Sequence, residues 1–148
     1  MRLVIQKVSE ASCTVDGKIT GSIGKGYMVL AGFGHSDDEK TVEKMANKLS
    51  KLRIFDDEEG KINRSIYDVE GQVLSISQFT LYADCKKGNR PSFSEALGGE
   101  RAVELYDCFN RCLEDLNIHV ETGIFGADMK VALINDGPVT IVMDSEDL

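Results

Sequence analysis

Three polar side chains follow an apolar run near the middle of the chain and could bind or activate a substrate there. They are Ser77, Gln78 and Thr80 in SISQFTLYAD, and a long polar segment, 82–98, begins directly after them. Sites often form where a buried element ends at a long surface loop. Hydroxyl, amide and main-chain N–H groups at such a point can donate hydrogen bonds to a substrate, although they can equally satisfy the backbone at the end of a strand.

A second segment, NDGPVT (135–140), interrupts a run that otherwise has the composition of a β-strand. Asp136-Gly137 is a hairpin turn signal, but Pro138 spoils the usual two-residue register and cannot donate to a sheet ladder. A cis Gly-Pro bond would make a sharp, rigid bend that points the glycine carbonyl outward. Because only about 5–6% of X-Pro bonds in folded proteins are cis, these residues alone do not decide the conformation.

The chain lacks the side-chain sets that ordinary hydrolases use. A Ser-His-Asp or Cys-His site would need one of two histidines, His35 after a glycine-rich turn or His119 between two apolar residues. The chain contains no HExxH motif and no clustered Asp-x-Asp that would indicate a metal site. The acidic run 56–59 has the composition of a solvated turn. Either the protein is not an enzyme, or its chemistry uses backbone groups and the substrate itself.

Composition indicates one soluble globular domain, residues 1–148, with 42% hydrophobic and 28% charged residues. No run of about 18 apolar residues indicates a membrane span, and the N-terminal MRLVIQKVSE lacks the apolar core of a secretory signal. The chain contains neither a GxGxxG match nor a Walker-type GK[ST] match, so we do not expect a nucleotide-phosphate loop. We therefore expect a cytoplasmic protein without membrane association, whose four cysteines are reduced thiols.

The net charge of −8 argues against non-specific binding of DNA or RNA. One segment, CKKGNRPSF (85–93), is locally basic, because Lys86, Lys87 and Arg90 have no acid between them. Charge alone does not distinguish a small RNA-binding patch from an ordinary solvated loop.

The hydrophobic pattern predicts an α/β fold in the order ββ(βα)(βα)βββ. A helix is predicted over 36–52, where Ser36 and Glu39 form a capping-box pattern, and a second over about 100–116. Because two helices cannot cover both faces of so much sheet, we expect three layers, with the helices on one sheet that packs on a second sheet. The predicted extended runs are 2–15, 18–24, 26–34, 53–55, 72–81, 118–123, 128–135 and 138–144.

SQFTL (77–81) and NDGPVT (135–140) resemble the two signature motifs of D-aminoacyl-tRNA deacylases. The resemblance extends over nearly the whole chain, because MRLVIQKVSEASCTVDG, RIFDDEEGKIN, KKGNRPSFS and FGADMKVALINDGPVT all occur in the family's order and spacing. It implies hydrolysis of the ester between a D-amino acid and the 3′-terminal adenosine of tRNA, without a cofactor. It also implies a homodimer, with each active site at the subunit interface.

The resemblance further implies that Gly137 and Pro138 form a chiral gate. In the family the Gly-Pro bond is cis and enters the partner subunit's active site. D and L substrates carry the same groups, so discrimination needs a position where the wrong isomer collides. A main-chain carbonyl held by proline could accept a hydrogen bond from the substrate amine and leave no room for an L side chain.

The resemblance places Ser77, Gln78, Phe79 and Thr80 along the other wall of the pocket. No general base is evident near Thr80 in the sequence, and the family favours main-chain N–H groups around 78–80 as stabilisers of the oxyanion. The 2′-hydroxyl of the terminal ribose would then assist the attack on the ester. The remaining matched positions are Phe125, Gly126 and Met129 for the adenine, and Lys86, Lys87 and Arg90 for tRNA phosphates.

One residue departs from the family pattern. Members commonly carry arginine where this chain has Lys7, and that arginine is thought to help hold the Gly-Pro element. Lysine offers a single ammonium instead of a planar fork, so we expect the gate to be held differently.

Two other functions remain open at this point. The first is the related deacylase that edits L-alanine from mischarged tRNA, although Ser77 favours the D-specific branch. The second is a non-enzymatic dimer that binds RNA ends, which would suit the missing catalytic side chains. The resemblance also implies that glycyl-tRNA is cleaved, because glycine has no side chain to exclude.

Overall fold

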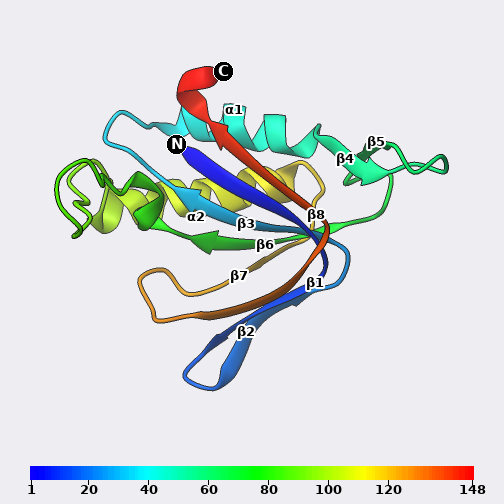
Figure 1. Ribbon diagram of the computed structural model, residues 1–148, viewed down its shortest axis with the longest axis horizontal. Coiled ribbons are helices and arrows are strands. Elements are labelled where there is room, and N and C mark those ends of the chain that lie inside the picture. The colour runs from blue at the N-terminus through cyan, green and yellow to red at the C-terminus, as the bar shows by residue number, and fades with distance from the viewer.

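Strand β1 is the element around which the sheet is built. The computed structural model describes residues 1–148, and β1 pairs antiparallel with β3 through Arg2–Val8 and with β2 through Ala11–Val15 (Figure 1). Its other edge pairs with β8 along nearly its whole length. The elements are β1 (Arg2–Val15), β2 (Lys18–Ile23), β3 (Gly26–Gly32), α1 (Glu39–Ser50), β4 (Arg53–Asp56), β5 (Ile62–Ser65), β6 (Gln72–Ser77), η1 (Phe79–Tyr82), α2 (Gly99–Asp115), β7 (Val120–Thr122), β8 (Lys130–Asp144) and η2 (Ser145–Asp147).

The main sheet curls until its edges approach each other. Its order is β2-β1-β3-β6-β7, with β8 on the far side of β1, and β6 runs parallel to β3 and β7. The edge strands β2 and β7 meet where Gly21 faces Thr122, since a Cβ at Gly21 would stand 2.8 Å from the carbonyl oxygen of Thr122. The absent side chain therefore lets the sheet nearly close into a barrel.

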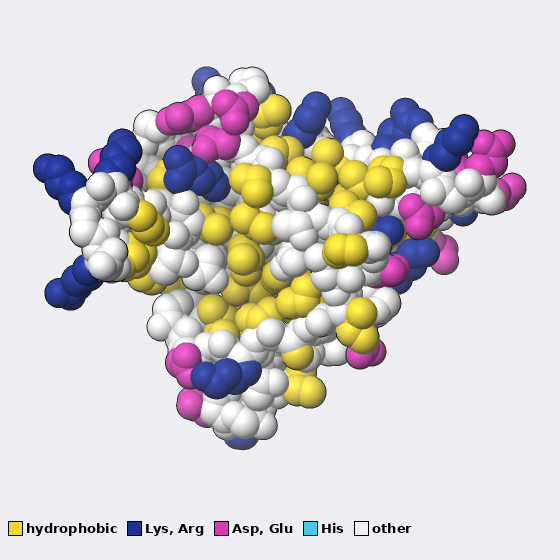
Figure 2. Space-filling view, in the orientation of Figure 1, with side chains coloured by type: hydrophobic (Ala, Val, Ile, Leu, Met, Phe, Trp, Pro, Cys, Tyr) yellow, Lys and Arg dark blue, Asp and Glu magenta, His cyan; other side chains and the backbone are white.

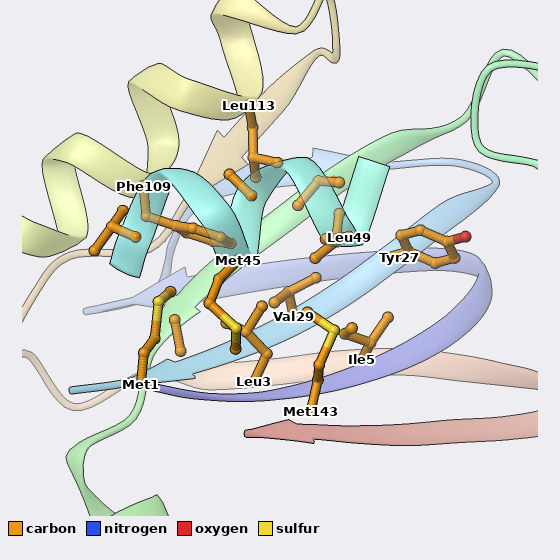
Figure 3. Close-up of a cluster of buried hydrophobic side chains, with 14 of the residues drawn as sticks. Met1, Leu3, Ile5, Tyr27, Val29, Met45, Leu49, Phe109, Leu113 and Met143 are labelled. Carbon is orange, nitrogen blue, oxygen red and sulfur yellow. The ribbon is translucent and has the colours of Figure 1, made fainter. Parts of the chain in front are cut away.

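Two hydrophobic clusters create the three layers. The larger, of 21 buried residues, lies between the helices and the N-terminal half of β1 with β3, and Figure 3 shows Leu3, Val29 and Met45 meeting there. The smaller, of seven residues, lies inside the curled part of the sheet and includes Cys13 and Leu74. The predicted α/β class and layer arrangement are confirmed. Helices α1 and α2 lie side by side on one face of the sheet (Figure 1).

The start of α1 differs from the predicted capping box. The helix begins at Glu39, and the carboxylate of Asp38, not the hydroxyl of Ser36, accepts the capping hydrogen bond from the N–H of Thr41 at 2.9 Å. Ser36 lies in the preceding turn. The neighbouring Asp37 is engaged elsewhere, since its carboxylate accepts from the N–H of Gly34 and pairs with the α-ammonium of Met1.

The last two predicted strands are one strand. The runs 128–135 and 138–144 join as β8, which carries a bulge where two separate strands were expected. On β1 only Lys7 separates Gln6 from Val8, whereas four residues, 136–139, separate their β8 partners Thr140 and Asn135. The extra residues therefore leave the ladder and project from the sheet. No helix is both long and apolar enough to cross a membrane.

Candidate functional site

A cavity of about 260 Å³ opens where β3 and β6 end. Two of the segments singled out in the sequence contribute to its wall, Ser77–Phe79 and, from the second, Phe125, Gly126 and Met129. Its lining also includes residues of β3 that no motif indicated. The full lining is Ala31, Gly32, Phe33, Ile76, Ser77, Gln78, Phe79, Leu97, Ala102, Phe125, Gly126, Ala127, Met129 and Val131.

The parallel pairing of β3 with β6 places the first wall. Ala31 pairs with Ser77 at the carboxyl ends of the two strands, and the N–H of Gln78 donates to the carbonyl of Ala31 at 2.8 Å. The chain then turns into η1. A Cβ at Gly32 would stand 2.8 Å from the carbonyl oxygen of Gln78, so glycine at this position permits the close turn.

Two of the expected polar side chains hydrogen-bond to each other. The side-chain amide of Gln78 donates to the hydroxyl of Thr80, and both residues are at least partly exposed. Thr80 is not part of the cavity lining, and no lining residue is a titratable acid or base. The N–H of Gln78 already donates to Ala31, so it is excluded from the expected oxyanion donors. The expected donors that remain are the N–H groups of Phe79 and Thr80, the first two residues of η1.

The carboxyl end of η1 is fixed by an arginine from β1. Arg2 donates to the carbonyl of Leu81 at 2.9 Å, and its guanidinium lies 4.4 Å from the centre of the Tyr82 ring. Burial raises the pKa of the Tyr82 hydroxyl, with the nearby Asp37 and Asp144 adding to the rise. With Gln78 bonded to Ala31 before it and Arg2 bonded to Leu81, η1 is held at both ends.

The second wall contains an aromatic ring and a thioether. The ring of Phe125 lies 5.9 Å from that of Tyr106, whose hydroxyl donates to the carbonyl of Ser75 at 2.7 Å. Gly123 allows the sulfur of Met129 to approach the sheet, since a Cβ at that position would overlap the sulfur. Phe125, Gly126 and Met129 are thus brought together in the same cavity as Ser77, Gln78 and Phe79.

Gly137 and Pro138 lie outside this cavity. Both are exposed at the bulge of β8, and the peptide bond between them is cis. The side chain of Asn135 spans the bulge, accepting from the N–H of Val139 at 3.2 Å and donating to the hydroxyl of Thr140 at 3.0 Å. Within one chain the structure therefore does not bring the two signature motifs together.

Lys7 lies beneath the bulge. It is only 4% exposed, and its ammonium is 3.7 Å from the carboxylate of Asp56 on β4. Its Cε is 3.7 Å from the position that a Cβ at Gly137 would occupy. The lysine stem thus contacts the bulge while the charge points toward the β4–β5 hairpin.

The two histidines are not in the cavity. The Nε2 of His35 lies 2.7 Å from the carbonyl oxygen of Ser94, and the Nε2 of His119 lies 2.8 Å from the carboxylate of Glu121. No group of three or more His, Cys, Asp or Glu side chains is placed to hold a metal ion.

The basic segment forms a loop beside the cavity. Asp84 and Ser92 exchange two backbone hydrogen bonds, of 2.7 and 2.9 Å, at its neck. Lys86, Lys87 and Arg90 are exposed beyond that neck, and none of them forms an ion pair. Sequence reasoning did not single out Phe93 in this loop, although an aromatic residue within a polar, basic run was a signal that could have drawn attention to it.

Residues 4–144 match the family model described as D-Tyr-tRNA(Tyr) deacylase. A protein from Bacillus pumilus named D-aminoacyl-tRNA deacylase is 56% identical over 147 residues, which cover 99% of this chain and all of the relative. A Thermus aquaticus protein of the same name is 52% identical, over 99% of this chain and 97% of the relative.

Two solved structures have a similar fold. The c-Myc DNA unwinding element binding protein superimposes with a TM-score of 0.90 at 40% identity, covering 97% of this chain and 98% of that one. A probable eukaryotic D-amino acid tRNA deacylase superimposes with a TM-score of 0.83 over 96% of this chain and 97% of that one. At 18% identity the second likeness concerns the fold alone.

Proposed function

The chain belongs to the D-Tyr-tRNA(Tyr) deacylase family and is a D-aminoacyl-tRNA deacylase, a hydrolase of ester bonds, and from this premise we propose how its residues carry out the reaction. The substrate would be a D-amino acid esterified to the terminal adenosine of tRNA. The products would be the free D-amino acid and tRNA. No cofactor would take part.

The observation that carries this proposal is a cavity with two chemically different walls and no titratable lining residue. Phe125, Gly126 and Met129 would receive the adenine, since aromatic and thioether surfaces suit the face of a base. The reacting ester would then lie beside Ser77 and Phe79. Lys86, Lys87 and Arg90, exposed and without ion pairs, would meet the tRNA phosphates.

Main-chain groups and the substrate would supply the chemistry. The N–H groups of Phe79 and Thr80 would donate to the oxyanion that develops when water attacks the ester carbonyl, and removal of one such donor costs about 3–4 kcal/mol in other enzymes. The 2′-hydroxyl of the terminal ribose would assist the attack and its proton transfer. Ser77 and Gln78 would orient the substrate, with Gln78 held by Thr80.

Gly137 and Pro138 would act in the cavity of a second copy of the chain. The bulge is exposed in one chain, and an exposed apolar side chain lies on either side of it along β8, Ile134 at 54% and Val142 at 71% exposed. Figure 2 shows hydrophobic side chains gathered across the middle of one face, over the sheet. A contiguous exposed apolar surface of this kind supports a homodimer.

Such a gate would discriminate by exclusion. The carbonyl of Gly137 would accept a hydrogen bond from the α-ammonium of a D substrate. An L side chain would collide with this carbonyl, or the amine would lose its partner, and an unmade buried polar contact costs about 1–3 kcal/mol. Glycyl-tRNA would be cleaved as well, because glycine has no side chain to collide.

Ester hydrolysis of four charged tRNAs tests the proposal. The purified protein should release amino acid from D-tyrosyl-tRNA and glycyl-tRNA, and at least about ten-fold more slowly from L-tyrosyl-tRNA, which corresponds to the cost of one lost contact. Preferential hydrolysis of L-alanyl-tRNA would favour the related alanine-editing activity. Binding of all four without release would favour a non-enzymatic protein that binds RNA ends.

A further inference from the structure

Two aromatic rings lie exposed beside the cavity. The rings of Phe79 and Phe93 are 5.1 Å apart and nearly perpendicular, at 72°. Phe79 is 53% exposed and Phe93 39% exposed, although phenylalanine is among the residue types most often buried. Phe79 also lines the cavity, whereas Phe93 does not. The pair therefore extends the apolar surface of the cavity outward by one ring.

Phe93 is held in place by the backbone on both sides of it. Ser92 exchanges two hydrogen bonds with Asp84, and the carbonyl of Phe93 accepts from the N–H of Ala96 at 3.0 Å. On its other side, the carbonyl of Ser94 lies 2.7 Å from Nε2 of His35. The exposed ring is thus presented by a fixed part of the loop, which lowers the entropy lost when a flat ligand stacks on it.

The same loop carries positive charge that no carboxylate neutralises. Lys86, Lys87 and Arg90 are exposed and form no ion pair, while Asp84 and Glu95 are the only acids between 83 and 96. The loop lies at the left of Figure 1, and Figure 2 shows Lys and Arg side chains projecting at that edge. Exposed aromatic rings beside free cations are the combination with which proteins bind single-stranded nucleic acid.

We infer that Phe93, together with Phe79, is a stacking site for the nucleotide that precedes the terminal adenosine. In the CCA end of tRNA this nucleotide is a cytidine. The inference rests on the proposed function, because it takes the terminal adenosine to occupy the cavity. The strand must leave the cavity past its rim, and Phe93 is the ring next to the rim residue Phe79. The phosphate between the two nucleotides then lies near Lys86, Lys87 and Arg90.

The charge of the surroundings selects this occupant over a second protein chain. The loop that presents Phe93 carries three exposed cations, Lys86, Lys87 and Arg90, that pair with no carboxylate. A nucleotide carries negative charge to the cationic loop and a flat base to the rings. Stacking on a protein aromatic ring tolerates any base, so this site adds affinity for the RNA end and not sequence specificity.

Three D-tyrosyl esters of increasing length test the site. They are D-tyrosyl-adenosine, the D-tyrosyl ester of the trinucleotide CCA, and D-tyrosyl-tRNA. For the unmodified protein, KM should fall about five-fold or more from the adenosine ester to the CCA ester, which is the lower end of what one stacked base contributes. For Phe93→Leu, most of that fall should disappear, so the ratio of the two KM values approaches one.

Tyr67→Leu is the matched control. Tyr67 is another exposed ring, at 45%, and it does not line the cavity, and its hydroxyl donates to the carbonyl of Leu116. This variant should keep the KM ratio of the unmodified protein. Equal KM values for the adenosine and CCA esters in the unmodified protein would overturn the inference. A change of oligomeric state in Phe93→Leu, measured by light scattering, would also overturn it, because the ring would then belong to a subunit contact.

Binding of uncharged CCA and of adenosine, measured by calorimetry, separates this inference from the proposed function. If no ester is hydrolysed, the proposed function fails, yet tighter binding of CCA than of adenosine that Phe93→Leu abolishes would still support the stacking site. If the esters are hydrolysed but CCA binds no better than adenosine, the stacking site is wrong and the proposed function stands.

Discussion

Lys7 supports the β8 bulge from below, with its Cε 3.7 Å from the position that a Cβ at Gly137 would occupy. This contact joins residues 130 positions apart in the chain, and it exists because β1 and β8 pair on either side of the bulge. The lysine departs from the arginine that the family resemblance led us to expect. Its single ammonium reaches Asp56 at 3.7 Å, so the aliphatic stem is the part that faces Gly137.

Two substitutions of Lys7 should distinguish the contribution of its aliphatic stem from that of its ammonium group. Lys7→Met keeps a stem of similar length and removes a buried charge, and Asp56, whose side chain is 57% exposed, is then solvated by water. The free energy of unfolding should therefore change little or rise. Lys7→Ala should lower it by about 2–4 kcal/mol, because it leaves a cavity under the bulge. Urea unfolding gives the free energies, and the ratio of D-tyrosyl- to L-tyrosyl-tRNA cleavage should fall only for alanine. An equal loss of that ratio in both variants would mean that the charge holds the bulge.

Gly137→Ala should displace the bulge. Gly137 has a φ of +129°, and a Cβ there would stand 2.9 Å from Cγ2 of Val139. A residue other than glycine needs about 1–3 kcal/mol to adopt this positive φ. We therefore expect the rate of D-tyrosyl-tRNA cleavage to fall at least about ten-fold and its preference over L-tyrosyl-tRNA to narrow. Gly24→Ala is the control, since nothing lies within 4 Å of its Cβ position. An unaltered D/L preference in Gly137→Ala would remove Gly137 from the gate.

Thr80→Ala should reduce activity only modestly. The substitution removes the hydroxyl that accepts from Gln78 but keeps the main-chain N–H that we assign to the oxyanion. Loss of one neutral hydrogen bond corresponds to about 0.5–1.5 kcal/mol, or a fall of about two- to ten-fold in kcat/KM. Single-turnover kinetics on D-tyrosyl-tRNA measures it. Complete and specific loss of hydrolysis, with the fold intact, would instead identify Thr80 as the nucleophile.

Neutralising the basic loop should weaken the salt dependence of KM for D-tyrosyl-tRNA. Each phosphate contact contributes about 0.7 to the slope of log affinity against log salt for single strands. Changing Lys86, Lys87 and Arg90 to serine should therefore flatten the slope, while Lys61→Ser should not, because Lys61 pairs with Glu59 on the distant β4–β5 hairpin. A slope that the three substitutions leave unaltered would exclude the loop from tRNA binding.

The Glu39–Arg101 pair between α1 and α2 should make stability depend on acid pH. Hydrogen bonding to Arg101 lowers the pKa of Glu39 to about 2 from its ordinary value of 4.5. The pair is therefore complete above pH 4.5, and its contribution is lost as the pH falls from 4.5 toward 2. Over this range the Tm of the unmodified protein should fall more steeply than that of Glu39→Gln. Because the pair is exposed, the difference should shrink in high salt. Parallel Tm curves at low salt would show that the pair contributes nothing.

Sequence by itself determined the elements whose signals are local. The apolar spacing of α2 and the runs of β1 and β3 were predicted within a few residues, because periodicity reports which face of one element is buried. The strand predicted over 72–81 begins as expected but ends at Ser77, and the 3-10 helix η1 takes the place of its last residues. The first signature motif and the matched FGADM segment also identified residues that the structure places in one cavity, Ser77, Gln78 and Phe79 with Phe125, Gly126 and Met129. The start of α1 was predicted less well, since the tertiary contacts of the loop determine which side chain is free to cap the helix.

Only the tertiary structure decided what depends on residues distant in the chain. The register of β1 against β8 makes 128–144 one strand with a bulge, and it places Lys7 under Gly137. The return of the polar loop to the cavity brings Phe93 to Phe79. Local patterns report burial and capping within a few residues. A strand register and a ring contact arise from pairing energies between segments that meet only when the whole chain has folded.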